Sequence, residues 1–84
     1  MKLPRKKPAH GKNLIGPNLH AIRIQLTPKV TLEDLSGRLA ARGLYLDRSA
    51  LSRIENQERA VFDFEVVTIA AALRVPLVQF YRTK

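Results

Sequence analysis

The sequence predicts an all-α fold of five short helices packed into one compact domain. Apolar residues recur at spacings of three and four along most of the chain, which is the helical period. Prolines and glycines separate these periodic segments, and no segment alternates between apolar and polar residues long enough to predict a strand. Helices this short are not stable alone, so they must pack together, and 84 residues suffice for one core.

The first two helices have recognisable ends. Pro17 suits the first turn of a helix, where its missing amide is no loss, and Pro28 ends that helix. Thr31 opens the second helix with a capping box that Asp34 completes, and Gly43 stops it. The apolar residues expected to face the core are Leu19, Ile22 and Leu26 in the first helix and Leu32, Leu35 and Leu39 in the second. The second helix also carries the small residues Ser36 and Gly37. The two small residues predict a close approach by a neighbouring helix.

The third helix, residues 47–56, has two contrasting faces. Asp47 is a good N-cap, because its carboxylate can accept the amides of the first turn. Leu51 and Ile54 point toward the core. The opposite face carries no carboxylate and consists of Ser49, Ser52, Arg53 and Asn56. Hydroxyl, amide and guanidinium groups suit phosphate oxygens and the acceptor edges of bases in a DNA major groove, although such a face is also compatible with simple solvation.

The last two segments complete the core. A fourth helix begins near Asp63, and Pro76 breaks it. Its buried stripe is Val66, Ile69, Ala70 and Leu73. Residues 77–81 form one more short turn or helix, in which Leu77 and Phe80 are expected to close the core.

The charge of the chain indicates an anionic partner. It contains 15 Lys and Arg against 7 Asp and Glu, a formal charge of +8. Such a domain favours polyanions, nucleic acid before an anionic membrane, although a merely soluble basic protein has the same balance. Residues 1–12 have no acid and are expected to form a disordered arm ahead of a folded domain at 13–84. The cations of the arm are Lys2, Arg5, Lys6, Lys7 and Lys12. They either contact a DNA backbone or minor groove, or add only non-specific attraction.

Several function classes find no support in the composition. The chain has no cysteine, and His10 and His20 stand apart from paired carboxylates, so no metal site and no cofactor is expected. No Ser-His-acid set, carboxylate pair or phosphate-binding glycine loop can be assembled for an enzyme or a small-molecule substrate. RNA binding lacks an aromatic stacking platform. There is no membrane-spanning segment and no visible signal peptide, which with the absent cysteine predicts a cytoplasmic protein.

The order of the segments resembles the lambda-repressor/Cro-type helix-turn-helix family, also called the XRE family. The resemblance rests on IRIQL, TLEDLSGRL, SALSRIEN and FEVVTIAAALRVPLVQF, and it extends over residues 13–81. It implies a sequence-specific DNA-binding transcriptional regulator, such as a repressor, that acts as a homodimer on a palindromic site and is nucleoid-associated when bound. The second and third helices would form the helix-turn-helix. A protein-interaction module on the same fold, antitoxin-like or coactivator-bridging, is the alternative hypothesis.

Two departures from the family concern the backbone around the third helix. The turn at 42–47 is longer than the family's usual short turn, so either the second helix runs on by one turn or a real loop intervenes. Gln57 stands where the family commonly has glycine. It must adopt either a left-handed backbone, at a cost of about 1 kcal/mol, or another turn.

The resemblance and the outer face of the third helix together give the candidate contacts. The residues expected at base edges are Arg48, Ser49, Ser52 and Arg53. Those expected at phosphates are Thr31, Asn56 and Arg59, of which Arg59 is equally compatible with solvation. A homodimer is expected to use either the basic tail or the C-terminal residues Val75, Val78, Gln79 and Tyr81.

Arg23 and Glu55 lie on the apolar sides of the first and third helices, four residues after Leu19 and Leu51 respectively. Each charge would be costly to bury alone. Either the two meet, or each side chain reaches solvent separately. The family resemblance implies that they form a salt bridge, which would fix the third helix against the first.

Overall fold

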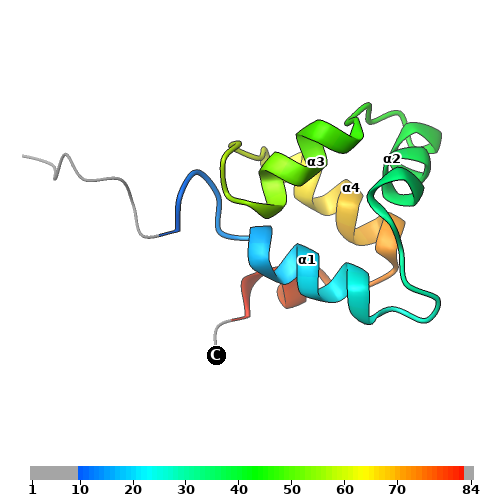
Figure 1. Ribbon diagram of the computed structural model, residues 1–84, viewed down its shortest axis with the longest axis horizontal. Coiled ribbons are helices and arrows are strands. Elements are labelled where there is room, and N and C mark those ends of the chain that lie inside the picture. Colours follow the sequence, from blue (N-terminus) through cyan, green and yellow to red (C-terminus); the bar gives the residue numbers. More distant parts are fainter. Residues whose placement is uncertain (1–9, 83–84) are drawn as a thin grey trace, which may run out of the picture.

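The computed structural model describes residues 10–82, and this part of the chain is all-helical and contains no strand (Figure 1). The elements in order are α1 (Gly16–Gln25), α2 (Leu32–Ala41), α3 (Arg48–Glu55), α4 (Asp63–Leu73) and the 3-10 helix η1 (Leu77–Tyr81). The all-α prediction is confirmed in this coarser form: residues 10–82 contain four α-helices, and the expected fifth helix is a short 3-10 helix. The predicted arm falls mostly beyond this range, and the cations that lie outside the described residues are Lys2, Arg5, Lys6 and Lys7.

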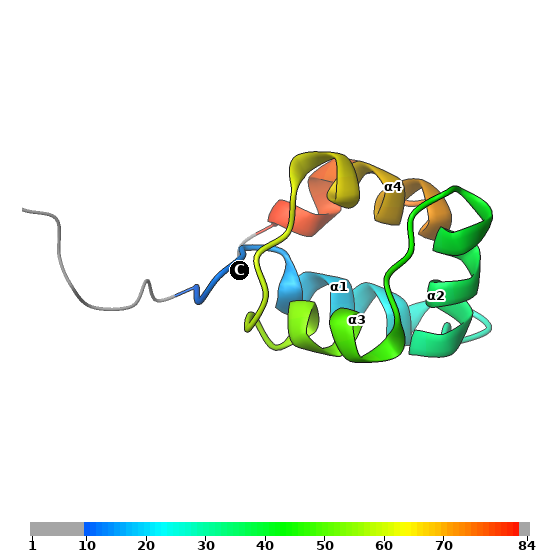
Figure 2. The same ribbon diagram turned by 90° about the horizontal axis from the view of Figure 1, so that it is seen from above.

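The helices enclose one core. α1 and α3 lie side by side on one side of it, α4 lies on the other, and α2 packs across one end against both α3 and α4 (Figure 2). The predicted stripes supply the buried residues Leu19, Leu35, Leu39, Leu51, Ile54, Val66, Ile69, Ala70 and Leu73. Phe80 of η1 is fully buried as well, whereas Leu77 is 43% exposed. The prediction that both residues close the core is therefore wrong for Leu77, which begins η1 outside the core cluster.

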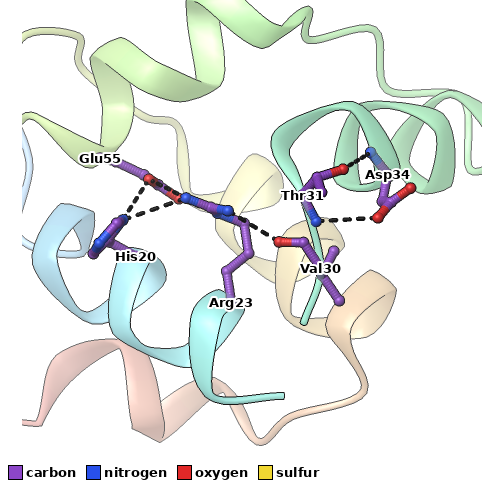
Figure 3. A network of polar contacts seen from close by, with 6 residues as sticks. All are labelled: His20, Arg23, Val30, Thr31, Asp34 and Glu55. Atoms are coloured by element: carbon purple, nitrogen blue, oxygen red, sulfur yellow. Dashed lines mark hydrogen bonds and ion pairs between the residues drawn. The ribbon is translucent and has the colours of Figure 1, made fainter. Parts of the chain in front are cut away.

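α2 and α3 begin with the caps that the sequence predicts. The Thr31 hydroxyl accepts a hydrogen bond from the Asp34 amide at 3.0 Å, and the Asp34 carboxylate accepts one from the Thr31 amide at 3.1 Å (Figure 3). These bonds hold the pKa of Asp34 below its usual value. Asp47 caps α3 by accepting from the Ala50 amide at 2.8 Å. The caps therefore fix where both helices start.

The turn at 42–47 is a real loop rather than an extension of α2, which ends at Ala41. Gly43 turns the chain with a φ of 83°, a backbone conformation that favours glycine. Leu46 is buried, and its carbonyl accepts a hydrogen bond from the Ser36 hydroxyl at 2.8 Å. The loop is thus anchored to α2 directly before the cap of α3.

Gly16 and Gly37 differ in what surrounds them. Gly16 is buried against the end of α3, and a Cβ there would lie 2.5 Å from the carbonyl oxygen of Ile54 and 2.7 Å from that of Glu55. Gly37 has nothing within 4 Å of the corresponding position. The close approach predicted at Gly37 is therefore wrong, because this residue faces open space. The close contact between helix backbones is at Gly16 instead.

Gly16→Ala is expected to destabilise the protein by about 2 kcal/mol, because the added methyl group must push α1 away from α3. Gly37→Ala is the matched control. It is expected to stabilise by about 1 kcal/mol, since alanine replaces glycine in an exposed helix interior. Urea denaturation followed by circular dichroism measures both changes. Equal stabilities for the two variants would show that α1 and α3 do not meet at Gly16.

Candidate nucleic-acid interface

α3 exposes its polar face and buries the opposite one. Leu51 and Ile54 are fully buried. The residues expected at base edges are all accessible at least in part: Ser52 is half-buried, and the other three, Arg48, Ser49 and Arg53, are exposed. Guanidinium and hydroxyl groups therefore project to solvent from a helix whose other side is locked in the core.

Arg48 is paired with an acid of the neighbouring helix. Its Nε lies 3.2 Å from Oε1 of Glu33, in the first turn of α2, and the two side chains are 71% and 66% exposed. A pair this exposed contributes little to stability and is easily exchanged for another partner. Arg48 can therefore turn to a phosphate or a base edge at small cost. Glu33 also puts a carboxylate beside α3, which the pattern of α3 alone did not reveal.

A hollow of about 530 Å³ opens beside α3, between α2, the 42–47 loop and the segment that follows α3. Arg53 and Arg59 both line it, so two of the predicted contact residues come together there. Tyr45 also lines the hollow and is 80% exposed. The sequence pattern did not single out Tyr45 as a contact residue. The unusual length of the turn is the signal that could have done so.

Two of the three expected phosphate contacts are engaged within the protein. Thr31 uses both its hydroxyl and its amide in the capping box. Arg59 donates to a neighbouring backbone carbonyl at 2.9 Å and to the two carboxylate oxygens of Glu65 at 3.3 and 3.4 Å. Glu65 is buried and also accepts from the Phe62 amide, so Arg59 ties the segment after α3 to the start of α4. Asn56, by contrast, is exposed at the end of α3.

Arg23 and Glu55 meet in the buried contact between α1 and α3 (Figure 3). Nε and Nη2 of Arg23 donate to Oε2 and Oε1 of Glu55 at 2.7 and 2.9 Å, and Nη1 donates to the Val30 carbonyl at 3.0 Å. The two side chains are only 9% and 7% exposed. The hydrogen-bonded carboxylate of Glu55 raises the pKa of Arg23 against the opposing effect of burial. This bidentate salt bridge fixes the C-terminal end of α3 on α1.

His20 is a third member of this cluster. Its Nδ1 lies 3.0 Å from Oε1 of Glu55 and 3.3 Å from Nη2 of Arg23, and its side chain is largely exposed. In the sequence, His20 was considered only as a metal ligand. Its contact with Glu55 and Arg23 was not predicted. The spacing of three residues to Arg23, which puts both on the same side of α1, is the signal that could have found it.

Asn13 is a positioning residue that the sequence pattern did not reveal. It is buried, and its Nδ2 donates to the carbonyls of Ile54 and Arg59 at 2.9 and 2.8 Å, while its Oδ1 accepts from the Gly16 amide at 2.8 Å. Gln57 takes the left-handed backbone, with a φ of 62°, and its Nε2 donates to the Asn13 carbonyl at 3.1 Å. Polar groups at the end of α3 are thus satisfied by the segment before α1.

The described residues contain no group of three or more His, Cys, Asp or Glu able to hold a metal ion. No helix among residues 10–82 has the length and apolar character needed to cross a membrane. Comparison with known proteins gave no match: no family model, no curated protein and no solved structure is significantly similar to the chain. The geometry of α3 and of the residues that support it is therefore the basis for a functional proposal.

Proposed function

We propose that this chain is a sequence-specific, double-stranded DNA-binding domain of the lambda-repressor/Cro helix-turn-helix type that regulates transcription. In this proposal α2 and α3 form the helix-turn-helix, the loop at 42–47 is its extended turn, and α3 enters the major groove. The observation that carries the proposal is the exposed guanidinium and hydroxyl face of α3, on a helix whose far side is clamped by Arg23 and Glu55. Readout of base edges needs side chains on such a rigid support.

The candidate residues divide into base readers and backbone contacts. Arg53 is the best base reader, because its planar fork can bond O6 and N7 of guanine. Neighbouring base contacts come from Arg48, Ser49 and Ser52. Asn56 and Lys12 are exposed and suit phosphates. Thr31 and Arg59 contribute less to phosphate binding, since the capping box and Glu65 occupy their polar groups.

A helix as short as α3 reads only a few base pairs, so a homodimer on a palindromic site is part of the proposal. Two copies of α3 would enter successive major grooves about 34 Å apart. A regulator of this kind works in the cytoplasm and is nucleoid-associated when bound to DNA.

Fluorescence anisotropy with a mixed-sequence duplex, at about 50–200 mM salt, tests the proposal. Arg48→Ala/Arg53→Ala is expected to weaken binding at least about tenfold more than Lys29→Ala/Arg82→Ala. The second variant removes the same charge from two exposed positions outside α3. Equal losses would contradict a role for α3. Tighter binding to polyglutamate than to DNA would favour the protein-interaction alternative, since an acidic protein satisfies the same arginines.

A further inference from the structure

α4 is apolar on its outer side as well as on its inner side. The inner stripe is buried in the core. On the outer side Phe64 and Val67 are 59% and 55% exposed, and Ala71 is exposed one turn further on. Phe62, at the N-cap, stacks on Phe64 with ring centroids 5.6 Å apart and ring planes 4° from parallel. A helix that is apolar all round is normally covered on all sides, so the outer side of α4 needs a cover.

Charged residues of opposite sign mark the two ends of this outer side. Asp63 is the first residue of the helix, and Arg74 follows its last residue. At 3.6 residues per turn, Asp63 falls on the same face as Val67 and Ala71, and Phe64 lies beside them. Arg74 stands directly past the end of the helix, in a left-handed backbone with a φ of 58°. All five residues are exposed. Together they form the α4 stripe, which has an acid at one end, an apolar centre and a base at the other end.

Arg74 belongs to a site that suits a carboxylate. With Arg38 and Arg42 it lines a hollow of about 710 Å³ between the ends of α2 and α4, and no carboxylate among the described residues lines this hollow. Arg38 and Arg42 each donate one hydrogen bond to a backbone carbonyl at the end of α4, at 3.2 and 3.4 Å. A guanidinium has five donors, so most of them remain for an anion. At the other end of the stripe, Asp63 has no ion-pair partner within residues 10–82.

We propose that the α4 stripe is a self-association surface, on which a second copy of the chain lies with its α4 antiparallel to the first. A two-fold axis midway between Asp63 and Arg74, near the middle of α4, brings Asp63 of each copy to Arg74 of the other. This contact satisfies both charges and covers both apolar centres at once. The carboxylate enters the hollow between Arg38, Arg42 and Arg74, where it accepts charge-assisted hydrogen bonds.

The stripe is complementary to itself rather than to a general acidic partner. An acidic partner would match the arginine end, but it would leave Phe64 and Val67 uncovered and would meet Asp63 with like charge. α4 lies on the side of the core opposite α1 and α3 (Figure 2), so the pairing leaves α3 exposed in both copies. The C-terminal segment is one of the two alternatives that the sequence offers for dimerisation. Its helix η1 exposes Leu77, Val78 and Tyr81, but it has no acid at one end to match a base at the other.

This inference names the surface through which the homodimer of the proposed function forms. Only the role of that dimer in DNA binding rests on the proposed function. Sedimentation equilibrium of the full chain without DNA tests the self-association. The wild type is expected to dimerise, and Asp63→Arg and Arg74→Asp are each expected to weaken association about tenfold. The double variant is expected to return to within about threefold of the wild type. Within one chain the two residues are about 16 Å apart along α4, so this recovery requires contact between copies.

Val67→Glu and Val78→Glu form a matched pair for the apolar centre. Each introduces a carboxylate at an exposed valine, one in α4 and one in η1. Val67→Glu is expected to weaken association more than about tenfold, and Val78→Glu to leave it unchanged. Thermal melts by circular dichroism verify that each variant is folded.

A wild type that stays monomeric throughout the micromolar range would overturn the proposal. A double variant, Asp63→Arg with Arg74→Asp, that does not recover self-association would also overturn it. So would a loss of self-association in Val78→Glu but not in Val67→Glu. Because this assay contains no DNA, it fails separately from the duplex titration. The chain can self-associate through the α4 stripe even if it does not bind DNA, and α3 can bind DNA even if the chain stays monomeric.

Discussion

Glu55→Ala is expected to lower the free energy of unfolding by about 3 kcal/mol and the Tm by roughly 15 °C. The substitution leaves the guanidinium of Arg23 buried, with the Val30 carbonyl as its remaining backbone partner. A buried charge that has lost its counter-charge is strongly destabilising, because its lost hydration is no longer offset. The same change also releases the end of α3 from α1. Urea denaturation and thermal melts measure both quantities.

Glu33→Ala is the matched control for this prediction. It removes a carboxylate from the exposed pair with Arg48 and is expected to cost less than about 1 kcal/mol. Combining Glu55→Ala with Arg23→Ala is expected to cost less than the sum of the two single changes, since neither charge is then left unpaired. A Tm unchanged by Glu55→Ala would show that Arg23 and Glu55 do not form a buried pair in solution.

Arg53→Ala is expected to weaken binding to the preferred duplex by about 1–3 kcal/mol, which is roughly 5-fold to 150-fold. The reason is the loss of two parallel hydrogen bonds to one guanine. On mixed-sequence DNA the loss is expected to be smaller, because there the guanidinium contributes as a charge alone. Anisotropy titrations with both duplexes, at one fixed salt concentration, give the two losses.

Arg53→Lys separates charge from hydrogen-bonding geometry, because lysine keeps the cation but has no planar fork. It is expected to bind mixed-sequence DNA like the wild type and to lose most of the preference for the selected duplex. If Arg53→Ala kept the full preference for the selected duplex over mixed-sequence DNA, Arg53 would not read a base. Its side chain would then lie in the hollow that it lines with Arg59.

Local signals in the sequence predict most of the fold. The starts of α2 and α3 follow from Thr31 and Asp47, whose caps involve amides only three residues away. The buried stripes follow from the helical period, because each helix has one side in the same core. Arg23 and Glu55 could be paired for a related reason: a charge on an apolar side of a helix needs a partner.

Contacts between helices are harder to predict, because they depend on how the helices cross. Pro17 beside Gly16 marks a helix start, but nothing near Gly16 in the sequence indicates a neighbouring backbone, yet Gly16 touches one and Gly37 faces open space. Asn13 bonds carbonyls that are 41 and 46 positions away, and no local pattern encodes such partners. In the candidate interface, the period predicts which side of α3 faces outward. It does not predict that Glu65 engages Arg59, because that contact forms between separate segments.

Selection from a pool of randomised duplexes with the purified chain tests most directly whether the outward side of α3 reads DNA sequence. We predict enrichment of one sequence, arranged as a palindrome with half-sites about one helical turn apart, and loss of that enrichment for Arg48→Ala/Arg53→Ala. A pool that emerges without an enriched sequence, or one that the double variant enriches equally well, would contradict sequence reading by α3.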